Sequence, residues 1–129
     1  MTIRSVHTDA APRPAGHYVQ ATVHAGLVHV AGQLPIDPAT GTVVDGDTRV
    51  QADRTLANIA AILDAAGSGM DRVLMLTVHA VARDDWAAIN AACEAAFGAH
   101  RPARAIVGGA ELRPGCRLEM TAVAALRDD

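Results

Sequence analysis

The chain has 129 residues, of which 50% are hydrophobic and 19% are charged, and its formal net charge is −3. This length fits one domain, residues 1–129, and the composition is that of a compact soluble protein rather than a disordered or membrane-spanning one. All eleven basic residues are arginine, which excludes a lysine Schiff base, and three aromatic residues with a negative net charge argue against nucleic-acid binding.

The N-terminus and the cysteines together predict a cytoplasmic protein. Residues 1–18 lack the apolar centre of a secretory signal. Cys93 and Cys116 are too few for a disulfide framework, so we expect both to be small core residues in a reducing compartment.

Strands and one helix are predicted in the first half of the chain. Residues 1–16, rich in Pro and Ala, predict an irregular lead-in. Two strands follow over 18–26 and 27–37. Residues 37–44 predict a turn at Asp37, Pro38 and Gly41, followed by a short third strand at best. From Asp47 the apolar residues recur at helical spacing, with Asp47 as N-cap and Gly67 as the C-terminal glycine.

The second half predicts a strand, a helix and two more strands. The apolar run over 71–82 is typical of a central strand buried on both faces. Asp84 and Asp85 are suited to cap the next helix. Its apolar stripe consists of Trp86, Ile89, Cys93, Ala96 and Phe97. The last two strands are expected over 103–109 and 116–127.

This order predicts an α+β fold: a two-layer sandwich with two helices on one face of the sheet. The apolar strand residues are too many to lie under two helices, which predicts an apolar second face that associates with other copies of the chain. The residues in question are Val28, Val30, Ile106, Val107, Met120 and Val123.

Two charges stand out in the last two strands, Arg104 and Glu119. Arg104 is either an ordinary surface arginine or a fork of donors that holds a carboxylate or phosphate at two points. Glu119, between Leu118 and Met120, is either an exposed or structural residue or a second site group. If the last two strands form an antiparallel hairpin, both charges lie near its open end.

Metal and cofactor chemistry finds no support in the sequence. The six histidines form neither HxxxH nor HExxH, and no Cys or carboxylate completes a ligand set around them. There is no Ser-His-Asp order, nucleophile elbow or phosphate-binding loop. We therefore expect neither a metal nor a cofactor.

Five segments resemble the Rid family, also called YjgF-like or L-PSP-like proteins. They are "AGHYVQAT", "VHVAGQLPIDPATG", "QADRTLANIAAILDAAG", "INAACEAAFG" and "RPARAIVGGAELRPGCRLEMTAVA". The match runs from Gly16 to Leu126 in the family's own order. Its most specific part is Pro102-Ala103-Arg104 followed by Glu119 in an apolar strand.

The resemblance implies a chorismate-mutase-like fold with a mixed sheet, assembled as a homotrimer with ligand clefts between subunits. It also implies hydrolysis of reactive imines and enamines, such as 2-aminoacrylate, to 2-oxo acids and ammonia without a cofactor. The ligand would be a small carboxylate, an imine, an enamine or a 2-oxo acid, and no membrane or nucleic-acid partner is expected.

The resemblance also assigns roles to residues. Arg104 would clamp the substrate carboxylate, and Glu119 would orient or activate the attacking water. The substrate-binding positions would be Tyr18, Gly32, Asn90 and Ile106. RidA-type members often have cysteine where this chain has Ile106; the backbone N–H can still bind a carboxylate oxygen, but an apolar side chain is expected to alter the substrate range.

Two other functions stay open at the level of the sequence. One is a non-catalytic binder of small 2-oxo acids that uses the same arginine. The other is the endoribonuclease or translation-inhibitor activity attached to some family members, against which the missing lysines, the negative charge and the few aromatic residues argue.

Overall fold

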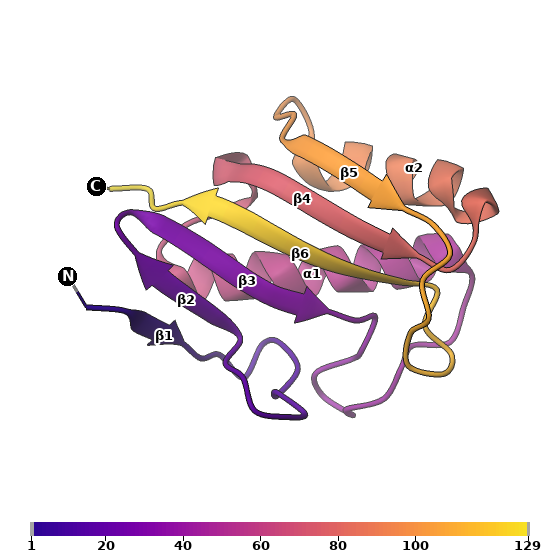
Figure 1. Cartoon of the computed structure of the whole chain (residues 1–129), viewed down its shortest axis with the longest axis horizontal. Coiled ribbons are helices and arrows are strands. Elements are labelled where there is room, and N and C mark those ends of the chain that lie inside the picture. Colours follow the sequence, from indigo (N-terminus) through magenta and orange to yellow (C-terminus); the bar gives the residue numbers. More distant parts are fainter. Residues whose placement is uncertain (1, 129) are drawn as a thin grey trace.

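The computed structural model describes residues 2–128 and contains a six-stranded sheet with two helices behind it (Figure 1). The strands are β1 (Arg4–Val6), β2 (Ala21–His24), β3 (Leu27–Gln33), β4 (Val73–Ala80), β5 (Ala103–Val107) and β6 (Leu118–Ala125). The helices are α1 (Thr48–Ala66) and α2 (Trp86–Phe97), and two short 3₁₀ turns, Met70–Arg72 and Arg83–Asp85, lie near the ends of β4. The α+β class and the two-layer arrangement predicted from the sequence are confirmed.

The strand order in the sheet is β1-β2-β3-β6-β4-β5. β5 is parallel to β4, as a right-handed crossover through α2 requires, and the other neighbours are antiparallel. The hairpin considered for the last two strands is wrong, because β4 lies between β5 and β6. The long loop 108–117 crosses the end of β4, whereas a hairpin would need a short turn.

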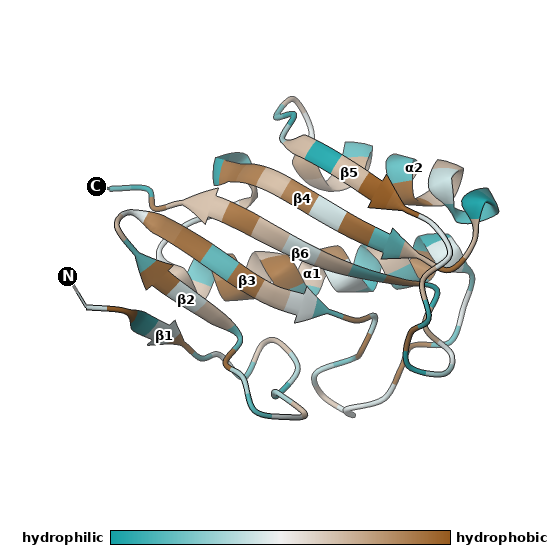
Figure 2. Ribbon diagram, viewed as in Figure 1, coloured by the Kyte–Doolittle hydropathy of each residue, from teal (hydrophilic) through white to brown (hydrophobic). Residues whose placement is uncertain are grey.

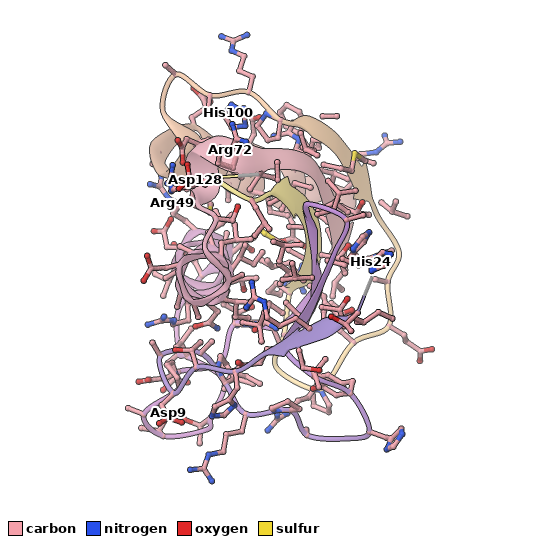
Figure 3. All side chains as sticks on the ribbon, turned by 90° about the vertical axis from the view of Figure 1, so that its left-hand side faces the viewer. Asp9, His24, Arg49, Arg72, His100 and Asp128 are labelled. Carbon is pink, nitrogen blue, oxygen red and sulfur yellow. The ribbon has the colours of Figure 1, made fainter. Side chains whose placement is uncertain are left out.

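Both helices cover the same face of the sheet and form the core with it. Figure 3 views the molecule along the sheet, with Arg49 of α1 on the helix side and His24 of β2 on the other side. Helix α1 begins and ends as predicted: the Asp47 carboxylate accepts a hydrogen bond from the Val50 N–H at 3.0 Å, and Gly67 takes the left-handed conformation (φ 87°).

The second face of the sheet, here called the open face, is less apolar than predicted. Val28, Val30 and Met120 are buried under the helices, and Ile106 packs against the same core. Helix α1 packs against β3 and β6, the strands that carry Val28, Val30 and Met120. Register places Val107 beside His79 and Val123 beside His29 on the open face. Figure 2 shows brown and teal positions along β3 and β4, where successive residues point to opposite faces of the sheet.

Strand β4 is fully buried on one face only, which corrects the prediction for residues 71–82. Val73, Leu76, Val78 and Ala80 lie in the core. Met75, Thr77 and His79 alternate with them on the open face and are half-buried. A single chain therefore leaves the centre of its sheet uncovered on one side.

The predicted irregular segments differ in detail. The N-terminal lead-in contributes β1, which pairs with β2 at the edge of the sheet. The third strand considered over 37–44 is reduced to one bridge between Ile36 and Val43. No helix within residues 2–128 is long and apolar enough to cross a membrane.

The start of α2 is held by a buried carboxylate. Asp85, 4% exposed, is the N-cap residue of α2. Contrary to the prediction, its side chain forms no capping hydrogen bond with this helix. It accepts hydrogen bonds from Thr48 Oγ1 (2.7 Å), the Arg117 guanidinium (2.9 Å) and the Ala82 N–H (3.1 Å). Burial raises the pKa of Asp85, but these hydrogen bonds outweigh burial and leave the pKa below its ordinary value.

Candidate active site

Arg104 lies on the edge strand β5 and points to the helix side of the sheet. It is in register with Leu76, which is fully buried in the core, and paired residues of neighbouring strands share a face. One guanidinium nitrogen donates to the Asn90 side-chain oxygen at 2.9 Å, and the guanidinium carbon lies 5.6 Å from the centre of the Trp86 ring. Helix α2 therefore holds the predicted clamp through two residues one turn apart.

Arg104 forms no salt bridge with any carboxylate of residues 2–128. The Asn90 amide nitrogen donates to the Glu94 carboxylate at 3.0 Å. The neutral Asn90 amide therefore lies between the Glu94 carboxylate and the Arg104 guanidinium. Arg104 and Asn90 line a cavity of about 540 Å³ together with Cys93, Glu94 and Phe97, among others. A half-buried cation with spare donors at a cavity suits an anionic ligand.

Cys93 shares this cavity but is a poor nucleophile. Burial raises the pKa of its thiol, and nearby Arg104 only partly opposes the shift. Cys93 is 6% exposed and belongs to the hydrophobic core, as the sequence predicted.

Glu119 lies on the open face of the sheet. It is in register with His79, which alternates with the buried residues Val78 and Ala80. Its carboxylate packs against Gly32 of β3: a Cβ at this glycine would lie 2.9 Å from Glu119 Oε2. Gly32 is therefore needed because any side chain there would displace the carboxylate.

Tyr18 lies near the same part of the sheet as Gly32. Both line a second cavity of about 500 Å³. The ring is 50% exposed, and its hydroxyl oxygen accepts a hydrogen bond from the Ala15 N–H at 3.1 Å. Tyr18, Gly32 and Glu119 thus form one group, which we call the glutamate half of the site.

Arg104 and Asn90 form the other group, the arginine half, and the two halves do not meet within one chain. Arg104 and Glu119 are separated by β4 and by three register positions, Leu76 to His79, which puts their Cα atoms about 14 Å apart. They also lie on opposite faces. Ile106 lines neither cavity, because its side chain packs against the core; its backbone N–H is what it can offer a ligand.

Three arginine and aromatic positions were not singled out as site residues from the sequence. Trp86 was assigned to the apolar stripe of α2, yet it is 48% exposed and lies over Arg104. Its spacing of four from Asn90 was the available signal. Arg13 and Arg113 come from distant segments and line the second cavity, which no local pattern indicates.

No group of three or more His, Cys, Asp and Glu side chains within the described residues could hold a metal ion. The side chains at the two halves can bind an anion, donate hydrogen bonds and accept a proton. These are the means for adding water to an already activated carbon.

Comparisons with known proteins agree with this fold and these motifs. Residues 8–126 match the family described as Endoribonuclease L-PSP. A RutC family protein of Pyrococcus abyssi is 40% identical, over 92% of this chain and 94% of its own length. A 2-iminobutanoate/2-iminopropanoate deaminase of Salmonella typhimurium is 36% identical, over 96% of this chain and 98% of its own.

The fold is shared with a solved structure of this group. Escherichia coli TdcF with bound serine superposes with a TM-score of 0.89 at 33% identity, covering 95% of this chain and 98% of that one. The match to the family spans nearly the whole described chain and includes every residue of both halves. The chain therefore belongs to the Endoribonuclease L-PSP family, the YjgF/RidA group that the motifs around Arg104 and Glu119 predicted.

Proposed function

We propose that the protein is a hydrolytic deaminase of reactive 2-imino and enamine acids, which it converts to 2-oxo acids and ammonia. One observation carries the proposal: Arg104, at a cavity, is held by a neutral amide and lacks a carboxylate partner within residues 2–128. Its guanidinium is thus available for the carboxylate of a small substrate.

The active site is completed by a second copy of the chain. The arginine half and the glutamate half lie on opposite faces of one sheet, so a substrate held by Arg104 cannot reach Glu119 of the same chain. The uncovered open face is a surface on which another copy can dock. We propose a homotrimer in which each cleft takes its arginine half from one protomer and its glutamate half from the neighbour.

The chemistry needs only these groups. An enamine first tautomerises to the imine. Water then adds to the C=N carbon while Glu119 accepts its proton, and the nitrogen takes up a proton. In the tetrahedral intermediate the new hydroxyl group then gives up its proton and the amino nitrogen takes one up, with Glu119 carrying the proton between them. The C–N bond breaks, which releases ammonia and leaves the 2-oxo acid. Arg104 and the Ile106 N–H would hold the carboxylate throughout, so positioning supplies much of the acceleration.

Two findings on relatives support this ligand class. A relative is named a 2-iminobutanoate/2-iminopropanoate deaminase, and another was solved with serine, which carries a carboxylate beside its amino group. The cytoplasmic location expected from the sequence would bring the enzyme close to the pyridoxal-phosphate enzymes that release such imines.

Subunit complementation tests the shared site. Arg104→Ala and Glu119→Gln variants are each expected to lose turnover of 2-iminopropanoate released in situ by an amino-acid oxidase. Refolding them together in equal amounts should restore activity in about one quarter of the sites, because random assembly then pairs an intact arginine with an intact glutamate. Each variant refolded alone is the control.

The outcomes separate the parts of the proposal. Mixed oligomers that form but recover nothing would contradict a site shared between copies. Wild-type protein that binds pyruvate yet hydrolyses no imine would contradict the enzyme and favour the non-catalytic binder.

A further inference from the structure

The second cavity carries two arginines that the deaminase proposal does not use. Arg13, from the N-terminal segment, and Arg113, from the loop between β5 and β6, both line it beside Tyr18 and Gly32. Neither arginine forms a salt bridge or a side-chain hydrogen bond with another of the described residues.

The charged residues that line this cavity are all positive. No Asp or Glu is among the residues that line it, although acidic residues outnumber basic ones in the chain. Glu119 packs against Gly32 at its border without pairing with either arginine. Two uncompensated guanidinium groups at one cavity attract an anion and can bind it at two points.

The walls of the cavity are fixed by two buried amides. Gln20, 1% exposed, accepts the Thr8 N–H at 2.7 Å and donates to the Thr8 and Pro12 carbonyls, both at 3.0 Å, which holds the segment that leads to Arg13. Asn58, fully buried on α1, donates to the carbonyls of Leu34 and Ile36 at 3.2 and 2.9 Å. These bonds order irregular backbone on both sides of the space before a ligand arrives.

We propose that Arg13 and Arg113 form a subsite for a second acidic group, so that the preferred substrates are imines of dicarboxylic amino acids. The inference rests on the proposed function and names its substrate class. Arg104 of one copy would hold the carboxylate next to the imine carbon. The side-chain carboxylate would extend past Tyr18 and Gly32 toward the two arginines.

The reaction stays the same hydrolysis. Water adds to the imine carbon, the C–N bond breaks, and 2-iminosuccinate becomes oxaloacetate and ammonia. The distal carboxylate takes no part in bond making. Its binding to Arg13 and Arg113 would raise kcat/KM by helping to hold the substrate.

The test compares two imines released in situ by amino-acid oxidases, 2-iminosuccinate from aspartate and 2-iminopropanoate from alanine. The wild-type protein should favour 2-iminosuccinate in kcat/KM. The Arg13→Ala/Arg113→Ala double variant should lower the ratio of the two kcat/KM values at least about tenfold, because hydrogen bonds between charged groups are lost. The single variant Arg113→Lys, with Arg13 unchanged, should retain part of the preference for 2-iminosuccinate.

The matched control is Arg49→Ala/Arg83→Ala, which removes two positive charges from other parts of the surface and should leave the ratio as in the wild type. If both double variants lower the ratio equally, the effect comes from the loss of positive charge in general, and the proposed subsite is wrong. It is also wrong if neither does.

A binding measurement keeps this inference separate from the deaminase itself. Calorimetric titration with oxaloacetate and with pyruvate needs no turnover. Tighter binding of oxaloacetate that is lost in Arg13→Ala/Arg113→Ala supports the subsite even if no imine is hydrolysed. Equal affinities for the two 2-oxo acids would overturn it.

Discussion

Two arginines, one on β5 and one just before β6, have opposite surroundings. Arg117, just before β6, forms a salt bridge at 2.9 Å with the buried Asp85 carboxylate. Arg104, on β5, donates to the Asn90 amide oxygen and lies beside the Trp86 ring, and it forms no salt bridge within residues 2–128. The first charge is neutralised within the fold, whereas the second is left open at a cavity.

This difference separates a structural ion pair from a candidate binding group. A cation with a buried carboxylate partner ties elements together: here α1, the segment before α2 and the segment before β6. A cation held by neutral groups keeps its donors for a ligand. Arg104 and Arg117 should therefore respond in opposite ways to substitution.

The largest effect is expected from Arg104→Ala. Losing two charge-assisted hydrogen bonds to the substrate carboxylate should lower kcat/KM for imine hydrolysis by about a hundredfold or more. The free energy of unfolding should stay within about 1 kcal/mol of the wild type, since only exposed or half-buried contacts are removed. Steady-state kinetics and urea unfolding of the variant measure the two quantities. A variant that unfolds easily but keeps its kcat/KM would reverse the assignment of the two arginines.

Asp85→Asn should destabilise the fold by roughly 2 kcal/mol at pH 7, because three hydrogen bonds to a buried charged group are weakened. Chemical unfolding gives this difference directly. The kcat/KM of the folded and assembled variant should stay within about threefold of the wild type, since Asp85 belongs to neither half of the candidate site.

The same variant has a defined pH dependence. The pKa of Asp85 is lower in the folded chain than its ordinary value, so the stability it contributes is fully present above about pH 4 and is lost as pH falls through the folded value. The difference in unfolding free energy between wild type and Asp85→Asn should be constant from neutral pH down to about pH 5 and shrink below pH 4. A difference that stays constant at lower pH would show that the charge of Asp85 does not matter.

The smallest effect is expected from Trp86→Leu. The ring lies over the Arg104 guanidinium and is half exposed, so a cation–π contact there is worth about 0.5–1 kcal/mol. We expect kcat/KM to fall about two- to fivefold, with Trp86→Phe closer to the wild type. A loss as large as that of Arg104→Ala would mean that Trp86 contacts the substrate itself.

Local patterns sufficed for most of the fold. The caps Asp47 and Gly67 set the ends of α1, and the apolar run over 71–82 identified β4. The three residues of β1 are too few to show alternation, so that edge strand could not be seen in the lead-in. The position of β4 between β5 and β6 depends on where the chain returns to the sheet after α2, which no short window contains.

The candidate site residues could be named from the sequence, but their arrangement in space could not. Arg104 and Glu119 stand out as charges in apolar strands, yet the face each one occupies depends on its register with β4. The pairing of Arg13 and Arg113 around one cavity depends on two loops far apart in sequence. Family motifs supplied the residues, and only three-dimensional structure separated them into two groups.

The division of these groups between the two sides of a single sheet has a consequence for regulation by abundance. On the proposed arrangement a newly made, unassembled chain is inactive. It contains both halves of the site, but they lie on opposite faces of its sheet and cannot act on the same substrate molecule. Enzyme activity would then depend on the fraction of chains that are assembled, so a diluted sample would lose specific activity. Near the concentration at which the oligomer dissociates, a small rise in expression would increase the activity more than proportionally.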